Sequence, residues 1–143
     1  MSSKNKAFFD TNIWVYQFDR TAPAKQKRAE ELVEQYIIAE QAVISTQVVQ
    51  EFMNVALKKF DAQIPADELE LIAREILKPL CQHVPSFDFY ERTLRLYRSE
   101  SINFYDALIV QAALDLECKT LYSEDLQSDR SYGILTVKNP FKT

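Results

Sequence analysis

The chain has 143 residues, of which 47% are hydrophobic and 27% are charged, which is the composition of an ordinary water-soluble globular domain. A chain of this length buries a core without help from disulfides or structural metals. Gly133 is the only glycine, so the glycine-rich loops that cradle phosphates in nucleotide-binding proteins are excluded.

The charge balance is acidic, with a formal net charge of -4 and a pI of about 5.1. The chain therefore does not carry the basic excess that is usual in nucleic-acid-binding proteins. That objection weakens if several acids gather in one site that binds divalent cations, because a substrate then meets the charge of the cation as well.

The two cysteines, Cys81 and Cys118, are far apart and belong to no CxxC motif. We interpret them as free thiols in the core, which favours a reducing, cytoplasmic location. The polar residues 1–6 lead into an apolar run that is too short for a signal peptide or a membrane span. We therefore expect neither export nor membrane insertion.

The first predicted element is a short strand over residues 7–9, which ends at Asp10-Thr11-Asn12. An apolar run followed by short polar residues is typical of a buried parallel strand whose carboxyl end opens into a helix. Ligands bind at this edge of open α/β sheets, which makes Asp10 a candidate ligand. The alternative is that Asp10 is a turn residue and that Thr11 or Asn12 caps the next helix.

A helix is predicted over residues 24–40, after Pro23, because its apolar residues recur at three- and four-residue steps. Its first turn contains Lys25, Lys27 and Arg28, although positive charge is unfavourable at this end of a helix dipole. These side chains either form a solvated face of the helix or have a role other than stabilising the helix.

Residues 42–44 form the second predicted strand, and Ser45 or Thr46 caps a helix that runs to about Phe60. Glu51 lies at the edge of the apolar arc of this helix. A carboxylate that faces the protein needs a counter-charge or a metal, because desolvation costs several kcal/mol. Otherwise Glu51 reaches out to water from the edge of the arc.

The next elements are a helix over residues 65–78, a strand over 81–85 and a helix over 87–98. His83 has no second histidine at ligand spacing, so we interpret it as a strand-end residue and not as a metal ligand. Arg92, Arg95 and Arg98 follow at three-residue spacing on one helical face, where they either bind phosphates or form a solvated surface.

The most apolar helix is predicted over residues 107–117 and is preceded by Asp106, which lies on the same face as Ile109 and Val110. The alternative to a ligand is that Asp106 is a first-turn acid stabilised by the helix dipole. A strand over 119–122 then ends at Ser123-Glu124-Asp125, and a last strand spans 132–137.

The alternation of strands and helices predicts an α/β fold, with residues 1–143 forming a single three-layer domain. We expect a central, mostly parallel sheet of four to five short strands with helices on both faces. Such a topology brings strand ends and adjoining helix starts to one rim.

Four acids occupy suitable positions for that rim: Asp10 and Asp125 follow strands, and Glu51 and Asp106 lie on helices. Two carboxylates at about 4 Å repel by roughly 4 kcal/mol at an effective dielectric of 20. A converging cluster must therefore take up protons or cations. Oxygen ligands without histidine or thiolate favour Mg²⁺ or Mn²⁺ over Zn²⁺.

In order and spacing, these segments resemble a PIN domain, and more particularly the toxin nucleases of the VapC type. The resemblance covers nearly the whole chain and is carried by residues 8–12 (FFDTN), 45–52 (STQVVQEF), 103–109 (NFYDALI) and 121–126 (LYSEDL). It implies a PIN-like fold and a metal-dependent endoribonuclease that leaves 5'-phosphate and 3'-hydroxyl ends.

The resemblance also implies roles for individual residues. Asp10, Glu51 and Asp106 match the family's three core acids, and Asp125 matches the more variable fourth acid. Thr11, Asn12 and Ser123 match polar positions that orient the acids or a metal-bound water. If the strand before Asp125 ends one residue earlier, Glu124 points inward instead.

The partners expected from the resemblance are an RNA substrate, an antitoxin protein and a second copy of the chain. The candidate RNA-contacting residues are Lys25, Lys27, Arg28, Arg92, Arg95 and Arg98. One alternative is a PIN-fold RNA-binding or RNA-processing protein that is not a toxin or is catalytically inactive. An aspartate-nucleophile phosphatase is disfavoured, because its second aspartate is replaced by Asn12.

Overall fold

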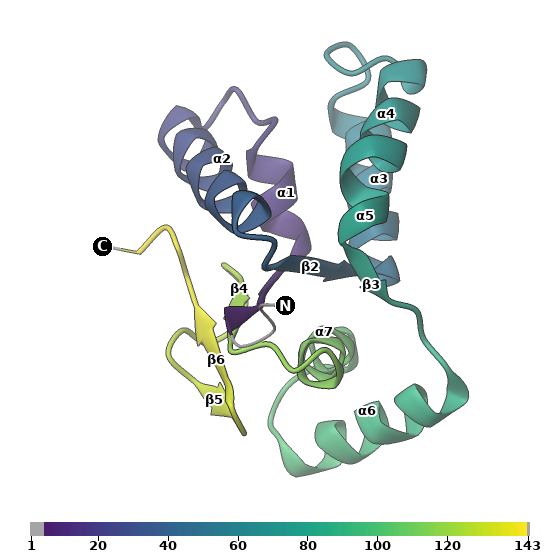
Figure 1. Cartoon of the computed structure of the whole chain (residues 1–143), viewed down its shortest axis with the longest axis vertical. Coiled ribbons are helices and arrows are strands. Elements are labelled where there is room, and N and C mark those ends of the chain that lie inside the picture. The colour runs from purple at the N-terminus through teal and green to yellow at the C-terminus, as the bar shows by residue number, and fades with distance from the viewer. Residues whose placement is uncertain (1–4, 143) are drawn as a thin grey trace.

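The computed structural model describes residues 5–142, and within them six strands form one sheet in the order β3-β2-β1-β4-β6-β5 (Figure 1). The strands are β1 (Ala7–Phe9), β2 (Ala42–Ser45), β3 (Cys81–His83), β4 (Thr120–Tyr122), β5 (Ser131–Tyr132) and β6 (Leu135–Lys138). The central strand β1 is parallel to β2 on one side and to β4 on the other. The predicted α/β fold with a mostly parallel sheet is confirmed.

The sheet has one strand more than expected, because the predicted last strand is divided in two. Gly133 has a φ of 60°, in the left-handed region that favours glycine. The chain therefore turns back at this residue, and β5 pairs with β6 in the antiparallel direction. All the other strand pairs are parallel.

The helices cover both faces of the sheet (Figure 1). Helix α2 lies on one side of the strands and α7 lies on the other, with α6 packed against α7. The helices are α1 (Thr11–Tyr16), α2 (Pro23–Ile38), α3 (Thr46–Lys59), α4 (Ala66–Ile72), α5 (Lys78–Leu80), α6 (Phe87–Ser99) and α7 (Phe104–Asp115).

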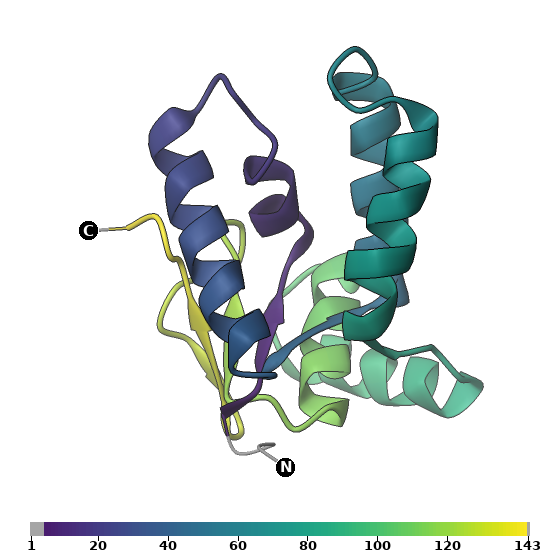
Figure 2. The same ribbon diagram turned by 45° about the horizontal axis from the view of Figure 1, so that its top comes forward.

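The helix predicted over residues 65–78 is a continuous helical run that contains a π-helical turn, η2 (Ala73–Leu77), between α4 and α5. Figure 2 shows this run lying beside α3, so that the two form an arm that projects from the sheet. Helix α1 packs between this arm and α2, in contact with both α3 and α2.

The core is formed by the strands and by the inner faces of the helices around them, and residues 107–113 of α7 are all buried. This burial agrees with the sequence of residues 107–113, in which Gln111 is the single polar residue. Both cysteines are free thiols, and Cys118 is fully buried. No helix within residues 5–142 is long and apolar enough to cross a membrane.

We expect Leu121→Ala, on β4 next to the central strand β1, to lower the free energy of unfolding by about 2–5 kcal/mol. Leu121 is fully buried, so the substitution leaves a cavity in the core. Leu57→Ala is the matched control, because Leu57 is 56% exposed and its loss should change stability by less than about 0.5 kcal/mol. Denaturant titration of both variants measures the difference, and equal losses would contradict the described core.

Candidate active site

Asp10 lies at the carboxyl end of β1, in the middle of the sheet, and only 8% of its surface is exposed. It is the N-cap of α1. One carboxylate oxygen accepts a hydrogen bond of 2.7 Å from the Thr11 backbone N–H, and the other accepts one of 2.8 Å from Ser123 Oγ. Both oxygens are thus held in place by donors from two strand ends.

Glu51 comes to the same edge from α3. Its Oε1 accepts a hydrogen bond of 2.6 Å from Thr11 Oγ1. Its Oε2 accepts a hydrogen bond of 3.2 Å from Gln47 Nε2, which also lies 3.4 Å from the backbone oxygen of Tyr105. Glu51 is therefore neither a solvated side chain nor an isolated buried charge.

Asp106 lies in the first turn of α7, which begins at Phe104 and not at Ala107 as predicted. The helix begins earlier because Asn103 is its N-cap and accepts a hydrogen bond of 2.8 Å from the Asp106 N–H. Asn103 Nδ2 also donates to Asp106 Oδ2 at 3.0 Å. One asparagine thus caps the helix and orients the carboxylate.

Ser123 and Asp125 lie just after β4, the other neighbour of β1. Ser123 is fully buried, and while its Oγ donates to Asp10 it accepts hydrogen bonds from the backbone N–H groups of Asp125 and Leu126, at 3.2 and 3.3 Å. The Asp125 side chain is exposed and lines a cleft of about 290 Å³ together with Thr11 and Asn12.

These bonds form one chain that links the positions of the four acids. It runs from the Asp125 backbone through Ser123, Asp10, Thr11, Glu51 and Gln47 to the carbonyl of Tyr105, next to Asp106. Every donor in this chain is a neutral amide or hydroxyl. The carboxylates are therefore oriented without being neutralised by a basic side chain.

The acids also act on one another electrostatically. Burial raises the pKa of Asp10 to about 6, the hydrogen bonds from Ser123 and Thr11 work against this rise, and the charges of Glu51 and Asp125 add to it. Burial likewise raises the pKa of Asp106, with further contributions from Asp125 and Glu51. Burial disfavours the charged form of a carboxyl group and is the main cause of both shifts, and the like charges nearby act in the same direction.

The carboxylates do not meet at a single point. Within residues 5–142, no group of three or more histidine, cysteine, aspartate or glutamate side chains is close enough to hold a metal ion. A buried acceptor, Asn12 Oδ1, has no hydrogen-bond partner within the described chain, although Asn12 lines the cleft beside Asp125. A buried unpaired oxygen is costly, so this atom is suited to a water or a cation.

Glu124, the alternative to Asp125, has other partners. Its carboxylate accepts a hydrogen bond of 2.7 Å from Tyr16 Oη and forms an ion pair with Lys25. Burial alone would raise its pKa, but the bonds from Lys25 and Tyr16 lower it overall. Glu124 therefore points toward α1 and α2, whereas the charge of Asp125 acts on Asp10 and Asp106.

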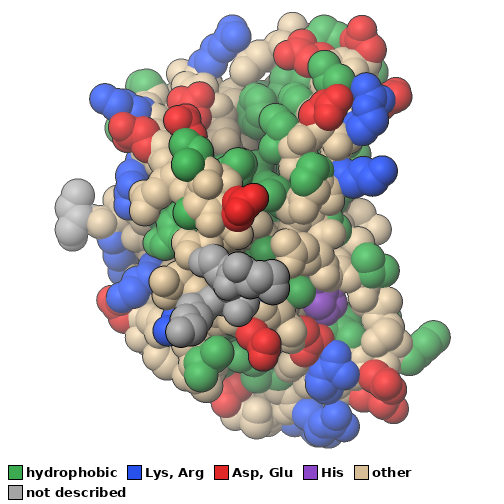
Figure 3. All heavy atoms as spheres, in the orientation of Figure 1, with side chains coloured by type: hydrophobic (Ala, Val, Ile, Leu, Met, Phe, Trp, Pro, Cys, Tyr) green, Lys and Arg blue, Asp and Glu red, His purple; other side chains and the backbone are tan. Residues whose placement is uncertain are grey.

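The candidate RNA-contacting residues differ in their surroundings. Lys25 is paired with Glu124, and Arg92 binds Asp115, with its Nη2 at 2.7 Å from Asp115 Oδ2. The remaining four candidates are exposed: Lys27, Arg28, Arg95 and Arg98. Of these, Arg28 donates a hydrogen bond to the backbone oxygen of Pro140. Figure 3 shows basic side chains over α2 and over α6, interspersed with acidic ones.

Sequence reasoning did not single out Gln47, Asn103 or Lys59. The spacing of Gln47 and Asn103, four and three residues before an acid on a helix, was a usable signal. Lys59 lines the cleft with Asp125 and forms an ion pair of 3.1 Å with Asp19. It had no such signal, because a lysine in the last turn of a helix is ordinary.

A family model described as PIN domain matches residues 7–132 of the chain. The chain belongs to the PIN-domain family. The resemblance stated from the sequence is thus confirmed, and PIN domains are generally nucleases, which are hydrolases. The roles of the individual residues of this PIN domain stay predictions.

Two solved structures share the fold. A toxin-antitoxin complex from Klebsiella pneumoniae aligns with a TM-score of 0.68 and 22% identity over 96% of this chain and 100% of that one. The structure of FitAcB from Neisseria gonorrhoeae aligns with a TM-score of 0.62 and 15% identity, over 96% and 99% of the two chains. No curated protein matches this PIN domain.

The raised pKa of Asp10 predicts how stability depends on pH without divalent cations. Because the folded pKa of about 6 exceeds the ordinary 3.8, the folded state binds the proton more tightly than the unfolded state. Stability from this group is therefore full below about pH 4 and is lost as the pH rises through 6. Near neutral pH, we expect Asp10→Asn to raise the free energy of unfolding by about 1–3 kcal/mol.

Urea titrations of the wild-type protein and the variant across this pH range, in the presence of EDTA, measure the effect. The difference between them should shrink as the pH falls through 6 toward 4. A difference that does not change with pH would mean that the Asp10 carboxylate is not perturbed.

Proposed function

We propose that this PIN domain is a metal-dependent endoribonuclease that hydrolyses RNA phosphodiester bonds, with Asp10, Glu51, Asp106 and Asp125 as its catalytic and metal-binding acids. The observation that supports this proposal best is the chain of neutral hydrogen-bond donors that joins their four positions. Such donors orient carboxylates but leave their charge available to a cation.

The donor set fits Mg²⁺ or Mn²⁺, because it consists of carboxylate oxygens with the unpaired Asn12 Oδ1 nearby. A bound divalent cation would activate water and neutralise the charge that develops on the leaving oxygen of a phosphodiester. Asp10, which is the most buried of the four acids and is held at both oxygens, would contribute the most rigid ligand.

The chain's own residues have distinct tasks in this proposal. Thr11 and Ser123 hold the carboxylates of Glu51 and Asp10 in fixed orientations. Lys59, which lines the cleft beside Asp125 and is paired there with Asp19, would reach an entering phosphate only by exchanging this partner. The exposed Lys27, Arg28, Arg95 and Arg98 are available for more distant phosphates of the RNA.

We further propose that the enzyme is the toxin of a toxin–antitoxin pair in the cytoplasm and that it forms a homodimer. The support is the shared fold with the toxin-antitoxin complex from Klebsiella pneumoniae, in which the alignment covers all of that chain. The two free cysteines agree with a reducing compartment.

We expect each of Asp10→Asn, Glu51→Gln, Asp106→Asn and Asp125→Asn to lower RNA cleavage by about a hundredfold or more, as loss of an essential electrostatic group does. The assay is cleavage of structured RNAs with Mg²⁺, with Mn²⁺ and with EDTA, and only the first two should give products. Cleavage that survives EDTA or Asp10→Asn would rule out the proposed nuclease.

Asp129→Asn is the matched control for these variants. Asp129 forms an ion pair with Lys138 on the surface, and its φ of 69° is a conformation that asparagine tolerates. Its substitution should leave cleavage within about twofold of the wild-type rate. Glu124→Gln tests whether Asp125 is the fourth acid. We expect it to leave the rate of RNA cleavage higher than Asp125→Asn does. A loss of cleavage as large as that of Asp125→Asn would contradict the assignment to Asp125 alone.

The toxin proposal predicts that induced expression arrests bacterial growth, whereas expression of Asp10→Asn does not. Co-expression of a small protein encoded beside the gene should restore growth and should co-purify with the enzyme. Normal growth with high levels of an enzyme that cleaves RNA in vitro would contradict the toxin role and leave the nuclease assignment intact.

A further inference from the structure

A second hollow, with a volume of about 230 Å³, lies beside the acids, between the ends of β2 and β3 and the helices α6 and α7. We call it the aromatic pocket. Much of its wall is apolar and is built from Phe89, Tyr90, Tyr105 and Leu108. Its volume is below the roughly 300–1,000 Å³ of pockets for drug-sized ligands, so it suits a single flat ring.

The aromatic pocket also contains an unpaired buried hydroxyl. Ser45, at the end of β2, lines the pocket and is only 3% exposed, yet its Oγ has no hydrogen-bond partner within the described chain. Although Ser45 is the N-cap of α3, its side chain caps nothing there. A buried hydroxyl with no partner is costly unless a ligand or water binds it.

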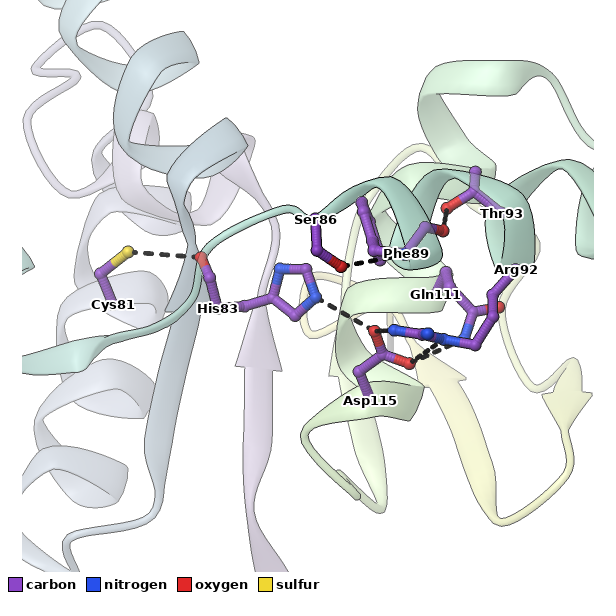
Figure 4. A network of polar contacts seen from close by, with 8 residues as sticks. All are labelled: Cys81, His83, Ser86, Phe89, Arg92, Thr93, Gln111 and Asp115. Carbon is purple, nitrogen blue, oxygen red and sulfur yellow. Dashed lines mark hydrogen bonds and ion pairs between the residues drawn. The ribbon is translucent and has the colours of Figure 1, made fainter.

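His83 is the second fixed polar group of the pocket and lies opposite Ser45 in the pairing of β2 with β3. Figure 4 shows its imidazole pointing from the end of β3 toward Asp115, where Arg92 and Gln111 also converge. His83 Nε2 lies 3.2 Å from Asp115 Oδ2, and the Phe89 ring lies 4.4 Å away, centroid to centroid.

The hydrogen-bond partners of His83 decide which of its two ring nitrogens remains available to a ligand. Asp115 accepts two bonds from Arg92, at 2.7 and 3.2 Å, and one of 2.9 Å from Gln111. A carboxylate so bound acts only as an acceptor, so His83 donates from Nε2. The other nitrogen, Nδ1, is left as the polar atom that His83 offers to a ligand.

The pocket is uncharged, which limits what it binds. Of the described residues that line it, none is lysine, arginine, aspartate or glutamate, and the neighbouring Arg92 and Asp115 neutralise each other. A phosphate or carboxylate would find no counter-charge here. Aromatic faces with hydroxyl, amide and imidazole groups instead match a nucleobase, which stacks through its face and forms hydrogen bonds through its edge.

The aromatic pocket adjoins the proposed catalytic acids through two residues. Gln47 lines the pocket and donates to Glu51. Tyr105 also lines the pocket and directly precedes Asp106; it is 67% exposed, so its ring is available for stacking. A base in the pocket would therefore belong to a nucleotide next to the bond that the acids act on.

We propose that the aromatic pocket binds one unstacked base of single-stranded RNA beside the scissile phosphodiester and so selects the cleavage site. This inference rests on the proposed ribonuclease function. Tyr90 and Tyr105 supply the stacking surfaces, and Ser45, His83, Gln47 and Gln50 supply donors and acceptors for the base edge. The pocket can bind only a base that has left the stack of its RNA neighbours, because the face of a base within the stack is covered.

The test uses the non-cleaving Asp10→Asn protein and a set of single-stranded RNAs in which one position at a time is abasic. Fluorescence anisotropy gives the affinity for each RNA. We expect one position at which loss of the base weakens binding on the order of tenfold, the range for a base stacked on an aromatic side chain. An equal loss of affinity at every abasic position, or no RNA binding at all, would overturn the proposal that the pocket binds a base.

Tyr90→Leu in the same background should abolish the difference between the intact RNA and the sensitive abasic RNA. Tyr97→Leu is its matched control, because Tyr90 and Tyr97 both lie on α6 and are 39% and 46% exposed, but only Tyr90 lines the pocket. Ser45→Ala should weaken binding only of RNAs that keep the base. Equal behaviour of Tyr90→Leu and Tyr97→Leu would overturn the proposal.

Cleavage of the same RNAs by the wild-type protein in Mn²⁺ is measured separately. Absence of cleavage would overturn the proposed ribonuclease, whereas the abasic series decides on the pocket. If both hold, cleavage should occur at the bond next to the sensitive base, and Tyr90→Leu should scatter the cleavage sites. Cleavage that keeps its position in Tyr90→Leu would show that the pocket does not select the site.

Discussion

The burial of a carboxylate at the edge of the sheet is the constraint around which this PIN domain is organised. Asp10 is almost fully buried, which raises its pKa, and the charges of Glu51 and Asp125 add to the rise. Within residues 5–142, no ion pair with a lysine or arginine neutralises Asp10 or the three other acids. The fold holds them with backbone amides, hydroxyls and side-chain amides, which restrict orientation and preserve negative charge for a cation.

The parallel sheet makes that arrangement possible. Because β1 lies between β2 and β4, the chain leaves three neighbouring strands at the same edge, and it leaves two of them directly into α1 and α3. Asp10, Glu51 and Asp125 come from segments that follow these three strands. Glu124 and Lys25 pair outside the four acids, so Glu124 does not add its charge to them.

The same edge supports two sites of opposite character. The cleft beside Asp125 is lined by charged side chains, namely Asp19, Lys59 and Asp125, whereas the described lining of the aromatic pocket is uncharged and includes an unpaired hydroxyl. Gln47 and Tyr105 belong to the boundary between them. In the proposed enzyme, one site would act on the phosphodiester and the other would read the adjacent base, so that reaction and selection depend on different chemistry.

The sequence by itself determined the element order and the parallel α/β class, because apolar runs that end in Asp10 or Ser123-Glu124-Asp125 are local patterns. The roles that it predicts for the four acids stay predictions. Tertiary structure alone decided the rest. The division of the last strand depended on the left-handed turn at Gly133. The pairing of Glu124 with Lys25 and the meeting of Ser45, His83 and Tyr105 in one pocket depended on contacts between elements far apart in the chain, which no local periodicity records.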